Sequence, residues 1–302
     1  MGQLAFWKPE TDQAPSVVNV AQVPQRSPFR YPGGKTWLVP HIRTWMRSLK
    51  ARPAVFIEPF AGGGIVSLTV AFEGLADHVV MVELDKDVAA VWKTMLSDQN
   101  DWLAERVATF DMNSESLRAE LSKKSATTRT IGFQTLLRNR TCHGGILAPG
   151  SGVLKHGENG KGIKSRWYPE TLRKRIQNIK FVRDRITFVE GDGIEAVKQY
   201  SHDRKAAFFI DPPYTAAGKR AGSRLYTHHQ LDHERLFDQC MGIRGDFVMT
   251  YDVADEVMAM AQSRKFQFDK VSMKNTHHST MQELVIGNDL SWVGTQDPDN
   301  LR

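Results

Sequence analysis

Short apolar runs and helical stripes alternate along most of the chain. Five apolar runs predict buried strands, at residues 55–58, 79–82, 186–190, 206–210 and 247–250. Apolar residues at helical spacing predict helices around them, over 38–49, 65–72, 168–180, 230–241 and 253–261. Two late segments, 271–273 and 283–286, predict a closing antiparallel pair. This alternation predicts an α/β fold with a doubly wound, mainly parallel sheet.

A helical and glycine-rich stretch interrupts the alternation between the second and third strands. Residues 88–140 have a mostly helical pattern, and seven glycines between 144 and 162 predict a long mobile loop or hairpin. We therefore expect a discontinuous core domain with an inserted subdomain. The expected bounds are a flexible extension over 1–27, the core over 28–100 and 175–292, a mostly helical, basic insert over 101–174, and a tail over 293–302.

Charge is the compositional feature that adds most to this picture. The 302-residue chain has a formal net charge of +6. Residues 151–186 hold ten lysines and arginines against three acids, an excess larger than that of the whole chain. This concentration favours a surface that meets phosphates, with a merely solvated face as the alternative.

Composition disfavours several classes of protein. No apolar run approaches the roughly 20 residues that span a bilayer, and the N-terminus lacks the basic and apolar stretches of a secretory signal. Cys142 and Cys240 lie far apart, and no paired Cys/His pattern of a metal site occurs. We expect a cytoplasmic protein with reduced thiols and without a membrane or metal partner.

Residues 54–87 predict a nucleoside-binding β-α-β unit. The first strand leads into Gly62-Gly63-Gly64, and glycines there let a ligand approach the backbone at a helix N-terminus. Glu83 ends the second strand, where an acidic residue is placed to bind ribose hydroxyls.

An NAD-binding fold shares this layout, but two features argue against NAD. Ser67 stands where the GxGxxG motif needs glycine or alanine. Glu58 and Phe60 put a carboxylate and an aromatic ring at the strand exit, which suits a cationic or amine-bearing ligand better than a pyrophosphate.

A second glycine-rich loop, Arg30-Tyr31-Pro32-Gly33-Gly34-Lys35-Thr36, opens onto the helix over 38–49. Its Gly-Lys-Thr ending is typical of a phosphate-binding P-loop. That motif needs a glycine six residues before the lysine, where Phe29 stands, and no buried strand leads into the loop. The sequence therefore excludes an ATPase of this class. A glycine turn that only caps the helix is the alternative to a ligand-binding loop.

The apolar run at 206–210 ends in Asp211-Pro212-Pro213-Tyr214. The prolines stop the strand because they cannot donate to a ladder and have a fixed φ. Asp211 and Tyr214 are therefore expected on a stiff turn at the carboxyl edge of the sheet, where open α/β sheets bind ligands. Taken alone, this run is also compatible with a rigid loop without function.

Four blocks in order resemble the Dam-like class of N6-adenine-specific DNA methyltransferases, over about residues 28–290. They are Tyr31-Pro-Gly-Gly-Lys35; Glu58-Pro-Phe-Ala-Gly-Gly-Gly64 with Glu83; Asn139-Arg140-Thr141 with Gly145; and Asp211-Pro-Pro-Tyr214. The segments 231–233 and 283–288 also look like that family. The resemblance implies a Rossmann-like methyltransferase fold, S-adenosylmethionine as cofactor, double-stranded DNA as substrate, and target recognition by the insert.

The resemblance also implies roles for single residues. Those implied to bind the cofactor are Tyr31, Lys35, Glu58, Phe60, Gly62, Glu83, Asp192 and Asp211. Those implied for catalysis are Asp211, Pro212, Pro213 and Tyr214. The candidates for DNA contacts are Arg138, Asn139, Arg140, Lys155, Lys164 and Arg166. Two positions differ from the family: Tyr31 stands where relatives often have tryptophan, and Glu83 stands where some have aspartate. Residues 144–165 match no relative, and because the family reads DNA with this insert, the target sequence stays open.

The chemistry explains these residue types. The exocyclic amine of adenine is a poor nucleophile, and two acceptors for its N–H bonds, Asp211 and the Pro212 carbonyl, would localise its lone pair toward the methyl donor. The target base must be flipped out of the duplex, and Tyr214 can stack on it. The alternatives are an RNA or protein N-methyltransferase, a catalytically inactive DNA-binding relative and, more distantly, an NAD-dependent oxidoreductase.

Overall fold

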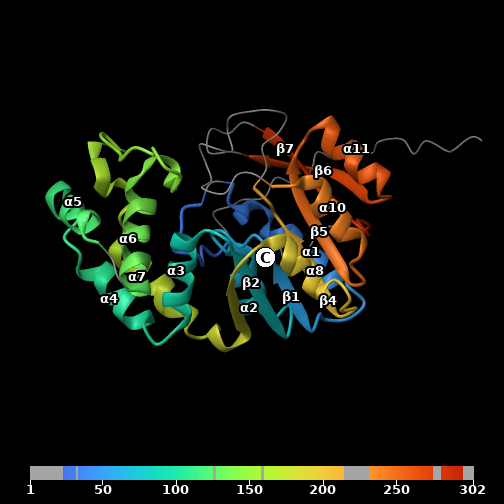
Figure 1. The fold of residues 1–302 in the computed structure, drawn as a ribbon, viewed down its shortest axis with the longest axis horizontal. Helices are drawn as coiled ribbons and strands as arrows, with labels where there is room; N and C mark the ends of the chain where they lie inside the picture. The colour runs from blue at the N-terminus through green and yellow to red at the C-terminus, as the bar shows by residue number, and fades with distance from the viewer. Residues whose placement is uncertain are drawn as a thin grey trace, which may run out of the picture.

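The computed structural model of the chain describes residues 23–31, 33–124, 127–157, 160–213, 231–274 and 280–294. Within these residues, seven strands form one sheet in the order β3-β2-β1-β4-β5-β7-β6 (Figure 1). The strands are β1 (Val55–Glu58), β2 (His78–Glu83), β3 (Ile186–Glu190), β4 (Ala206–Ile210), β5 (Asp246–Asp252), β6 (Gln267–Lys274) and β7 (Thr280–Gly287). Strands β1 to β5 pair in parallel, whereas β7 runs antiparallel to both β5 and β6.

Helices cover both faces of the sheet. Successive side chains of a strand point to opposite faces, and on β4 Phe209 joins one buried cluster while Phe208 joins the other. The first cluster includes α1 (Val39–Ser48), α2 (Ile65–Glu73) and α3 (Lys86–Leu96), and the second includes α8 (Gly193–Tyr200), α10 (His233–Met241) and α11 (Asp255–Ser263). The predicted doubly wound, mainly parallel α/β fold is therefore confirmed.

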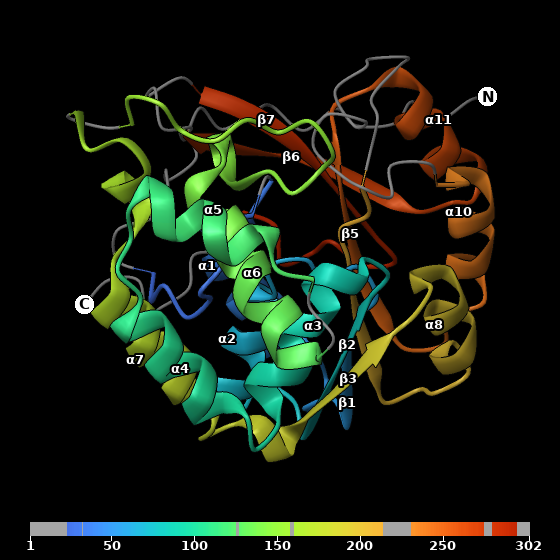
Figure 2. The same ribbon diagram turned by 60° about the vertical axis from the view of Figure 1, so that its left-hand side comes forward.

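A group of helices between β2 and β3 stands beside the sheet (Figures 1 and 2). It consists of α4 (Asn100–Thr109), α5 (Ser114–Ser122), α6 (Thr128–Thr141) and α7 (Pro169–Ile179). Asn100 joins this group to α3, because its Nδ2 donates to the carbonyls of Met95 (2.7 Å) and Ile176 (2.8 Å). Apolar side chains of these helices extend the cluster that α1 to α3 form on the sheet. The helical group is thus built onto one face of the core.

Some local expectations differ from the structure. Helix α8 was not predicted, because its eight residues hold only a short apolar stripe after the turn at Asp192, whose side chain caps it. The glycine-rich segment after α6 forms short 3-10 turns, η3 (His143–Gly145) and η5 (Gly162–Arg166), and a single bridge joins Cys142 to Val153. Two further 3-10 turns are η2 (Lys35–Leu38), before α1, and η6 (Arg183–Arg185), before β3.

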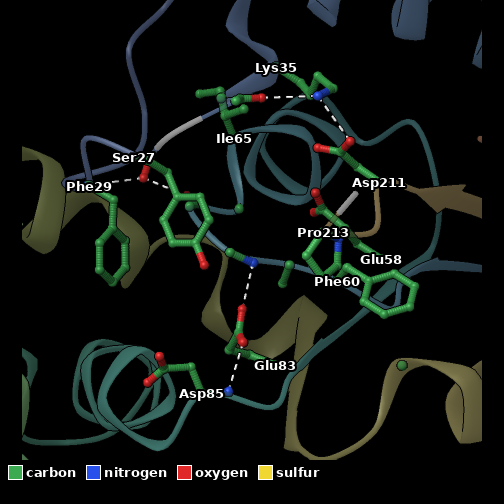
Figure 3. Close-up of a pocket in the computed structure, with 18 of the residues that line it drawn as sticks. Ser27, Phe29, Lys35, Glu58, Phe60, Ile65, Glu83, Asp85, Asp211 and Pro213 are labelled. Atoms are coloured by element: carbon green, nitrogen blue, oxygen red, sulfur yellow. Dashed lines mark hydrogen bonds and ion pairs between the residues drawn. The ribbon is translucent and has the colours of Figure 1, made fainter. Parts of the chain in front are cut away.

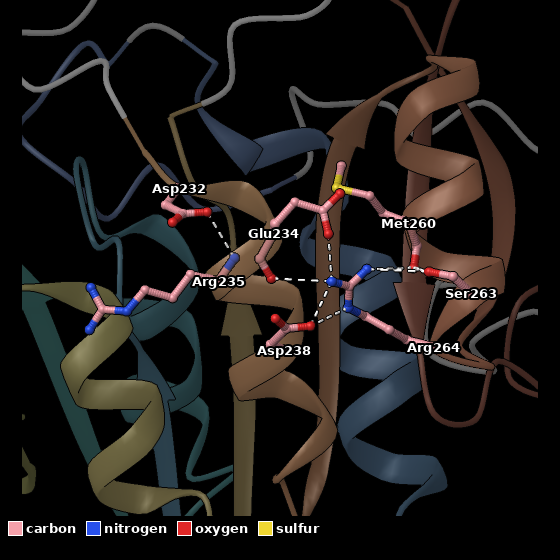
Figure 4. A network of polar contacts seen from close by, with 7 residues as sticks. All are labelled: Asp232, Glu234, Arg235, Asp238, Met260, Ser263 and Arg264. Atoms are coloured by element: carbon pink, nitrogen blue, oxygen red, sulfur yellow. Dashed lines mark hydrogen bonds and ion pairs between the residues drawn. The ribbon is translucent and has the colours of Figure 1, made fainter.

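A polar network ties α10 to α11 on the second face of the sheet (Figure 4). Arg264, at the end of α11, lies 2.6 Å from both Glu234 Oε2 and Asp238 Oδ1 of α10. Asp232 caps the start of α10 by accepting from the Arg235 amide (2.9 Å). Ion pairs with exposed carboxylates contribute only modestly to stability, so this network mainly fixes how the two helices lie against each other.

Gly64 fixes the turn that leads from β1 into α2. Its φ of +61° lies in the left-handed region, and a Cβ there would lie 2.5 Å from Trp92 Cζ2 and 2.6 Å from Met81 Cε. Its amide donates to the Ala61 carbonyl at 2.7 Å. Only glycine therefore allows the turn to pack this closely against α3 and β2.

We expect Gly64→Ala to destabilise the protein through two effects. The left-handed conformation of a residue with a Cβ costs about 1–2 kcal/mol, and overpacking against Trp92 adds about 1–3 kcal/mol. Gly74→Ala is the matched control, because Gly74 has a φ of +62° but its Cβ would meet only Arg185 Nη1, at 3.8 Å. Urea unfolding followed by circular dichroism should give a clearly lower free energy of unfolding for Gly64→Ala than for Gly74→Ala. Equal stabilities would contradict the packing described for the turn.

Candidate active site

A cavity of about 400 Å³ opens at the carboxyl edge of the sheet, a size that suits a small-molecule ligand (Figure 3). Its walls come from the segment around Tyr31, the ends of β1, β2 and β4, and the start of α8. The residues predicted to bind a cofactor all line it: Tyr31, Lys35, Glu58, Phe60, Gly62, Glu83, Asp192 and Asp211. Segments that are far apart in the sequence thus meet at one site.

Glu83 fastens the glycine turn to the end of β2. One carboxylate oxygen accepts from the Gly62 amide (2.9 Å), and the other accepts from the Asp85 amide (2.8 Å). Burial raises the pKa of Glu83 to about 7, although the two amides favour the charged form. The Trp92 indole donates to the Gly62 carbonyl at 2.9 Å, so the turn is held from two sides. Glu83 therefore stabilises the conformation of the glycine turn.

Glu58 is a buried carboxyl at the end of β1. Its Oε2 accepts from the Ser67 amide of α2 at 2.9 Å. Burial raises the pKa of Glu58 to about 8, and the neighbouring Asp211 and Glu83 add to this shift by repulsion. The site therefore holds an acidic group whose charged form becomes favourable when a cationic ligand approaches.

Asp211 follows β4 and is anchored through one of its two oxygens. Lys35 Nζ lies 2.9 Å from Asp211 Oδ1, and the Thr250 hydroxyl donates to the same oxygen at 2.8 Å. Lys35 also lies 2.9 Å from Glu283 Oε1 and donates to the Gly33 carbonyl (3.0 Å). Within the described residues, Asp211 Oδ2 makes no hydrogen bond. Figure 3 shows the Asp211 carboxylate between Lys35 and the cavity.

Two members of this cluster were missed by the sequence prediction. Thr250 lies in the middle of β5 and carries no signal beyond its strand. Glu283 belongs to a block that resembles the family, and it is a lone carboxylate at the start of an apolar run, which is itself a signal of a buried charge. Among the residues predicted for catalysis, Pro213 lines the cavity and Pro212 is buried. Tyr214 lies outside the described residues.

Two of the residues predicted to contact DNA have buried side chains. The Asn139 side chain is buried, accepts from the Arg30 amide (2.9 Å) and donates to the carbonyls of Arg30 and Gly145 (both 2.8 Å). The Arg140 side chain is 4% exposed and donates to the Pro28 carbonyl. Both side chains face inward, because they hold the backbone of the segment before Tyr31. Arg138 is half-buried and pairs with Asp87 at 2.6 Å.

A group of arginines, which we call the arginine cluster, lies where α6, α7 and η5 meet the segment before Tyr31. Its members are Arg30, Arg140, Arg166 and Arg175. Burial, followed by repulsion from Arg175 and Arg30, lowers the pKa of Arg140 to about 9. Burial and then Arg166 also lower the pKa of Arg30. The remaining basic candidates, Lys155 and Lys164, are both exposed.

The matched family covers most of the chain. A sequence profile described as D12 class N6 adenine-specific DNA methyltransferase matches residues 31–274. The chain belongs to this family. The methyltransferase is therefore an adenine-specific DNA-modifying enzyme, as the resemblance predicted. The alternatives of an RNA or protein methyltransferase and of an oxidoreductase are not supported.

Single proteins of known sequence or structure also resemble this methyltransferase. The Type II methyltransferase M.MjaIII of Methanocaldococcus jannaschii is 24% identical over 225 residues, which cover 68% of this chain and 75% of that protein. The rRNA methyltransferase aviRa of Streptomyces viridochromogenes is a similar solved structure, with 13% identity, coverage of 88% and 90%, and a TM-score of 0.38. Another is the precorrin-6y C5,15-methyltransferase of Geobacter metallireducens GS-15, with 11% identity, coverage of 83% and 87%, and a TM-score of 0.37.

The cavity of the methyltransferase fits the S-adenosylmethionine type of cofactor that its family implies. Three carboxyl groups, those of Glu58, Glu83 and Asp211, line it and suit a ligand with positive charge. A Cβ at Gly62 would lie 2.7 Å from the Tyr31 ring, so the glycine keeps an aromatic wall close to the backbone.

Two absences apply to the part of the chain that the structure describes. No group of three or more histidine, cysteine, aspartate or glutamate side chains there is arranged to hold a metal ion. None of the helices there combines the length and the apolarity that crossing a membrane requires.

Glu58→Gln tests the buried carboxyl through the pH dependence of stability. The pKa of Glu58 is about 8 in the folded protein, against an ordinary value of 4.5 for a glutamate in the unfolded chain, so the folded protein keeps a proton that the unfolded chain loses. The wild type therefore loses stability as the pH rises from about 4.5 to 8. Relative to the wild type, Glu58→Gln should gain unfolding temperature across this window, with the gain largest at about pH 9.

Glu73→Gln is the control with the opposite sign. Burial disfavours the charge of Glu73, but Arg43 and Arg26 outweigh it and lower the pKa of that carboxyl. The Glu73 variant should therefore lose unfolding temperature relative to the wild type above about pH 4.5. A difference between wild type and Glu58→Gln that stays constant from about pH 5 to pH 9 would contradict the protonated state of Glu58.

Proposed function

We propose that this methyltransferase transfers the methyl group of S-adenosylmethionine to N6 of an adenine that is flipped out of double-stranded DNA. The arrangement of the Asp211 carboxylate carries the proposal. Lys35 and Thr250 hold Oδ1, and Oδ2 makes no hydrogen bond among the described residues at the cavity. An acceptor fixed in this way can take one N6 hydrogen, and the carbonyl of Pro212 can take the other.

The two acceptors supply what the adenine amine lacks. Its lone pair is delocalised into the ring, and hydrogen bonds to both N–H groups favour a geometry in which the lone pair points at the methyl donor. When bound, S-adenosylmethionine supplies a methyl group on a cationic sulfonium. Polar groups that are already in place as charge develops are worth about 3 kcal/mol each. The stiff Pro212-Pro213 turn keeps the acceptors in place.

We assign cofactor binding to the residues that line the cavity. Tyr31 and Phe60 offer aromatic surface, and Glu58 suits the positive charge of the cofactor. Glu83 is held by two backbone amides, yet a carboxylate has further lone pairs and can also accept from a ribose hydroxyl. Asp192, at the start of α8, borders the same cavity.

The position of the acceptor supports base flipping. Asp211 lines a cavity at the sheet edge, whereas an adenine in a duplex is stacked between its neighbours. Extruding it costs a few kcal/mol. We assign to Tyr214, which follows the turn directly in the sequence, the task of stacking on the extruded base and recovering part of this cost.

We propose that residues 101–174 form the target-recognition subdomain and that its basic side meets the DNA backbone. Lys155 and Lys164 are at least partly exposed, and Arg166 belongs to the arginine cluster. Arginines that repel one another in a half-buried place favour binding of an anion, and phosphates of DNA supply the anions. In this proposal Asn139 and Arg140 support the surface from beneath.

Asp211→Asn tests the catalytic assignment. The amide keeps the shape of the side chain but loses its charge, so we expect the rate of a single turnover to fall by about 10²-fold or more. Transfer of labelled methyl groups to an adenine-containing duplex measures the rate, and calorimetry measures cofactor affinity. Asp246→Asn, at the opposite end of β5, is the control and should keep the wild-type rate. Wild-type turnover by Asp211→Asn would refute the assignment.

Lys164→Ala tests the DNA surface through salt. Each phosphate contact that is lost should reduce the slope of log affinity against log salt by about 0.9. Fluorescence anisotropy with a labelled duplex at several salt concentrations measures the slope. Lys205→Ala is the matched control, because Lys205 is exposed just before β4, at the opposite edge of the sheet from the cavity. Equal slopes for the wild type and both variants would exclude Lys164 from the DNA surface.

A further inference from the structure

Glu283 is a buried carboxylate at the site that the proposed function does not use. It lies on β7, paired with Asp252 of β5, and is 2% exposed. Its Oε1 lies 2.9 Å from Lys35 Nζ, the same distance that separates this nitrogen from Asp211 Oδ1. Lys35 itself is 4% exposed. Burying a carboxylate is unfavourable unless its charge is compensated, so this placement calls for a reason.

The net charge of the cluster explains why a carboxylate is buried here. One ammonium lies between two carboxylates, so Lys35, Asp211 and Glu283 together carry a net charge of −1. Without Glu283, Lys35 and Asp211 would form a neutral pair. The charge of Glu283 offsets part of the positive potential of Lys35, so the potential at Asp211 Oδ2 is more negative when Glu283 is present. Charges at such short distances interact strongly where water is excluded.

The reaction makes this net charge useful. As the bond from N6 to the methyl carbon forms and the bond from that carbon to sulfur breaks, positive charge passes from sulfur to N6. The sulfur is left as a neutral thioether, and N6 then releases one proton to the Asp211 carboxylate that accepts its hydrogen bond, from which the proton passes to water. Because Asp211 contacts N6 and not the sulfur, a net negative charge there stabilises the positive charge more as it moves onto N6, whereas a neutral pair would do so less.

We propose that Glu283 is a positioning residue for methyl transfer, which acts through Lys35 to fix the Asp211 carboxylate and to keep the catalytic edge negatively charged. The inference rests on the proposed role of Asp211 and extends it to β7. A purely structural Glu283 would only neutralise Lys35 in the core, and its loss would then lower stability without a specific effect on the chemical step.

Glu283→Gln, Lys35→Met and the double variant separate these two roles. The measurements are the single-turnover rate at saturating S-adenosylmethionine and duplex DNA, cofactor affinity by calorimetry, and thermal unfolding, all on the full chain. We expect Glu283→Gln to lower the rate by about 10- to 100-fold and to change cofactor affinity by less than about threefold. In the Lys35→Met background the same change should cost clearly less, because the part of the effect that passes through Lys35 is then lost and only the direct field of Glu283 on Asp211 remains.

Glu73→Gln is the matched control. Glu73, on α2, is a half-buried carboxylate that pairs with Arg26 and Arg43, and it does not line the cavity. We expect it to keep the wild-type rate. Glu283→Asp, which keeps the charge and shortens the side chain, should recover part of the rate that Glu283→Gln loses.

Several outcomes would overturn the inference. One is a wild-type rate for Glu283→Gln, and another is an equal loss with and without Lys35. If Glu283→Gln does not fold, Glu283→Asp decides: a wild-type rate overturns the inference, and a reduced rate with wild-type unfolding temperature supports it. Wild-type turnover by Asp211→Asn would instead overturn the proposed function itself, whereas an inactive Asp211→Asn beside a fully active Glu283→Gln overturns only this inference.

Discussion

The contact on which the site depends is the buried lysine that lies between two carboxylates. Lys35 brings together the loop before α1, the turn after β4 and the antiparallel strand β7. If this ammonium were removed, Asp211 and Glu283 would be left as like charges at the same sheet edge, which is strongly unfavourable in a buried place. Ion pairing of Lys35, together with the packing of its apolar residues, therefore holds the segment before α1 in place.

Acidic and basic groups meet along that segment. Burial raises the pKa values of Glu58 and Glu83 in the cavity, and burial, followed by repulsion within the arginine cluster, lowers the pKa of Arg140. Both kinds of group are unfavourable for the protein alone and favourable toward a ligand of opposite charge. Arg30, which belongs to the arginine cluster, also lines the cavity beside Tyr31. The burial of these groups therefore costs folding stability, and it leaves them preorganised to bind a ligand.

The sequence was informative where a local pattern has one physical meaning. Apolar runs that end in Glu58, Glu83 and Asp211 predicted the parallel strands, and since the carboxyl ends of parallel strands share an edge, they also predicted which residues meet. It failed where a contact depends on packing across the fold. Asn139 and Arg140 look like surface groups in a polar motif, and only the approach of α6 to the segment before Tyr31 buries them. The contact of Thr250 with Asp211 likewise depends on the pairing of β5 with β4, and the contact of Glu283 with Lys35 depends on the pairing of β5 with β7.

The inward-facing side chains of α6 and α7 have a consequence for how this enzyme could change its target. Asn139, Arg140 and Arg175 form hydrogen bonds with the backbone of residues 27, 28 and 30. The helical group that we propose for target recognition is thus fastened to the segment that borders the cavity. An engineered chimaera that takes this helical group from a relative must also take residues 27–30 from it, because these hydrogen bonds would otherwise be lost.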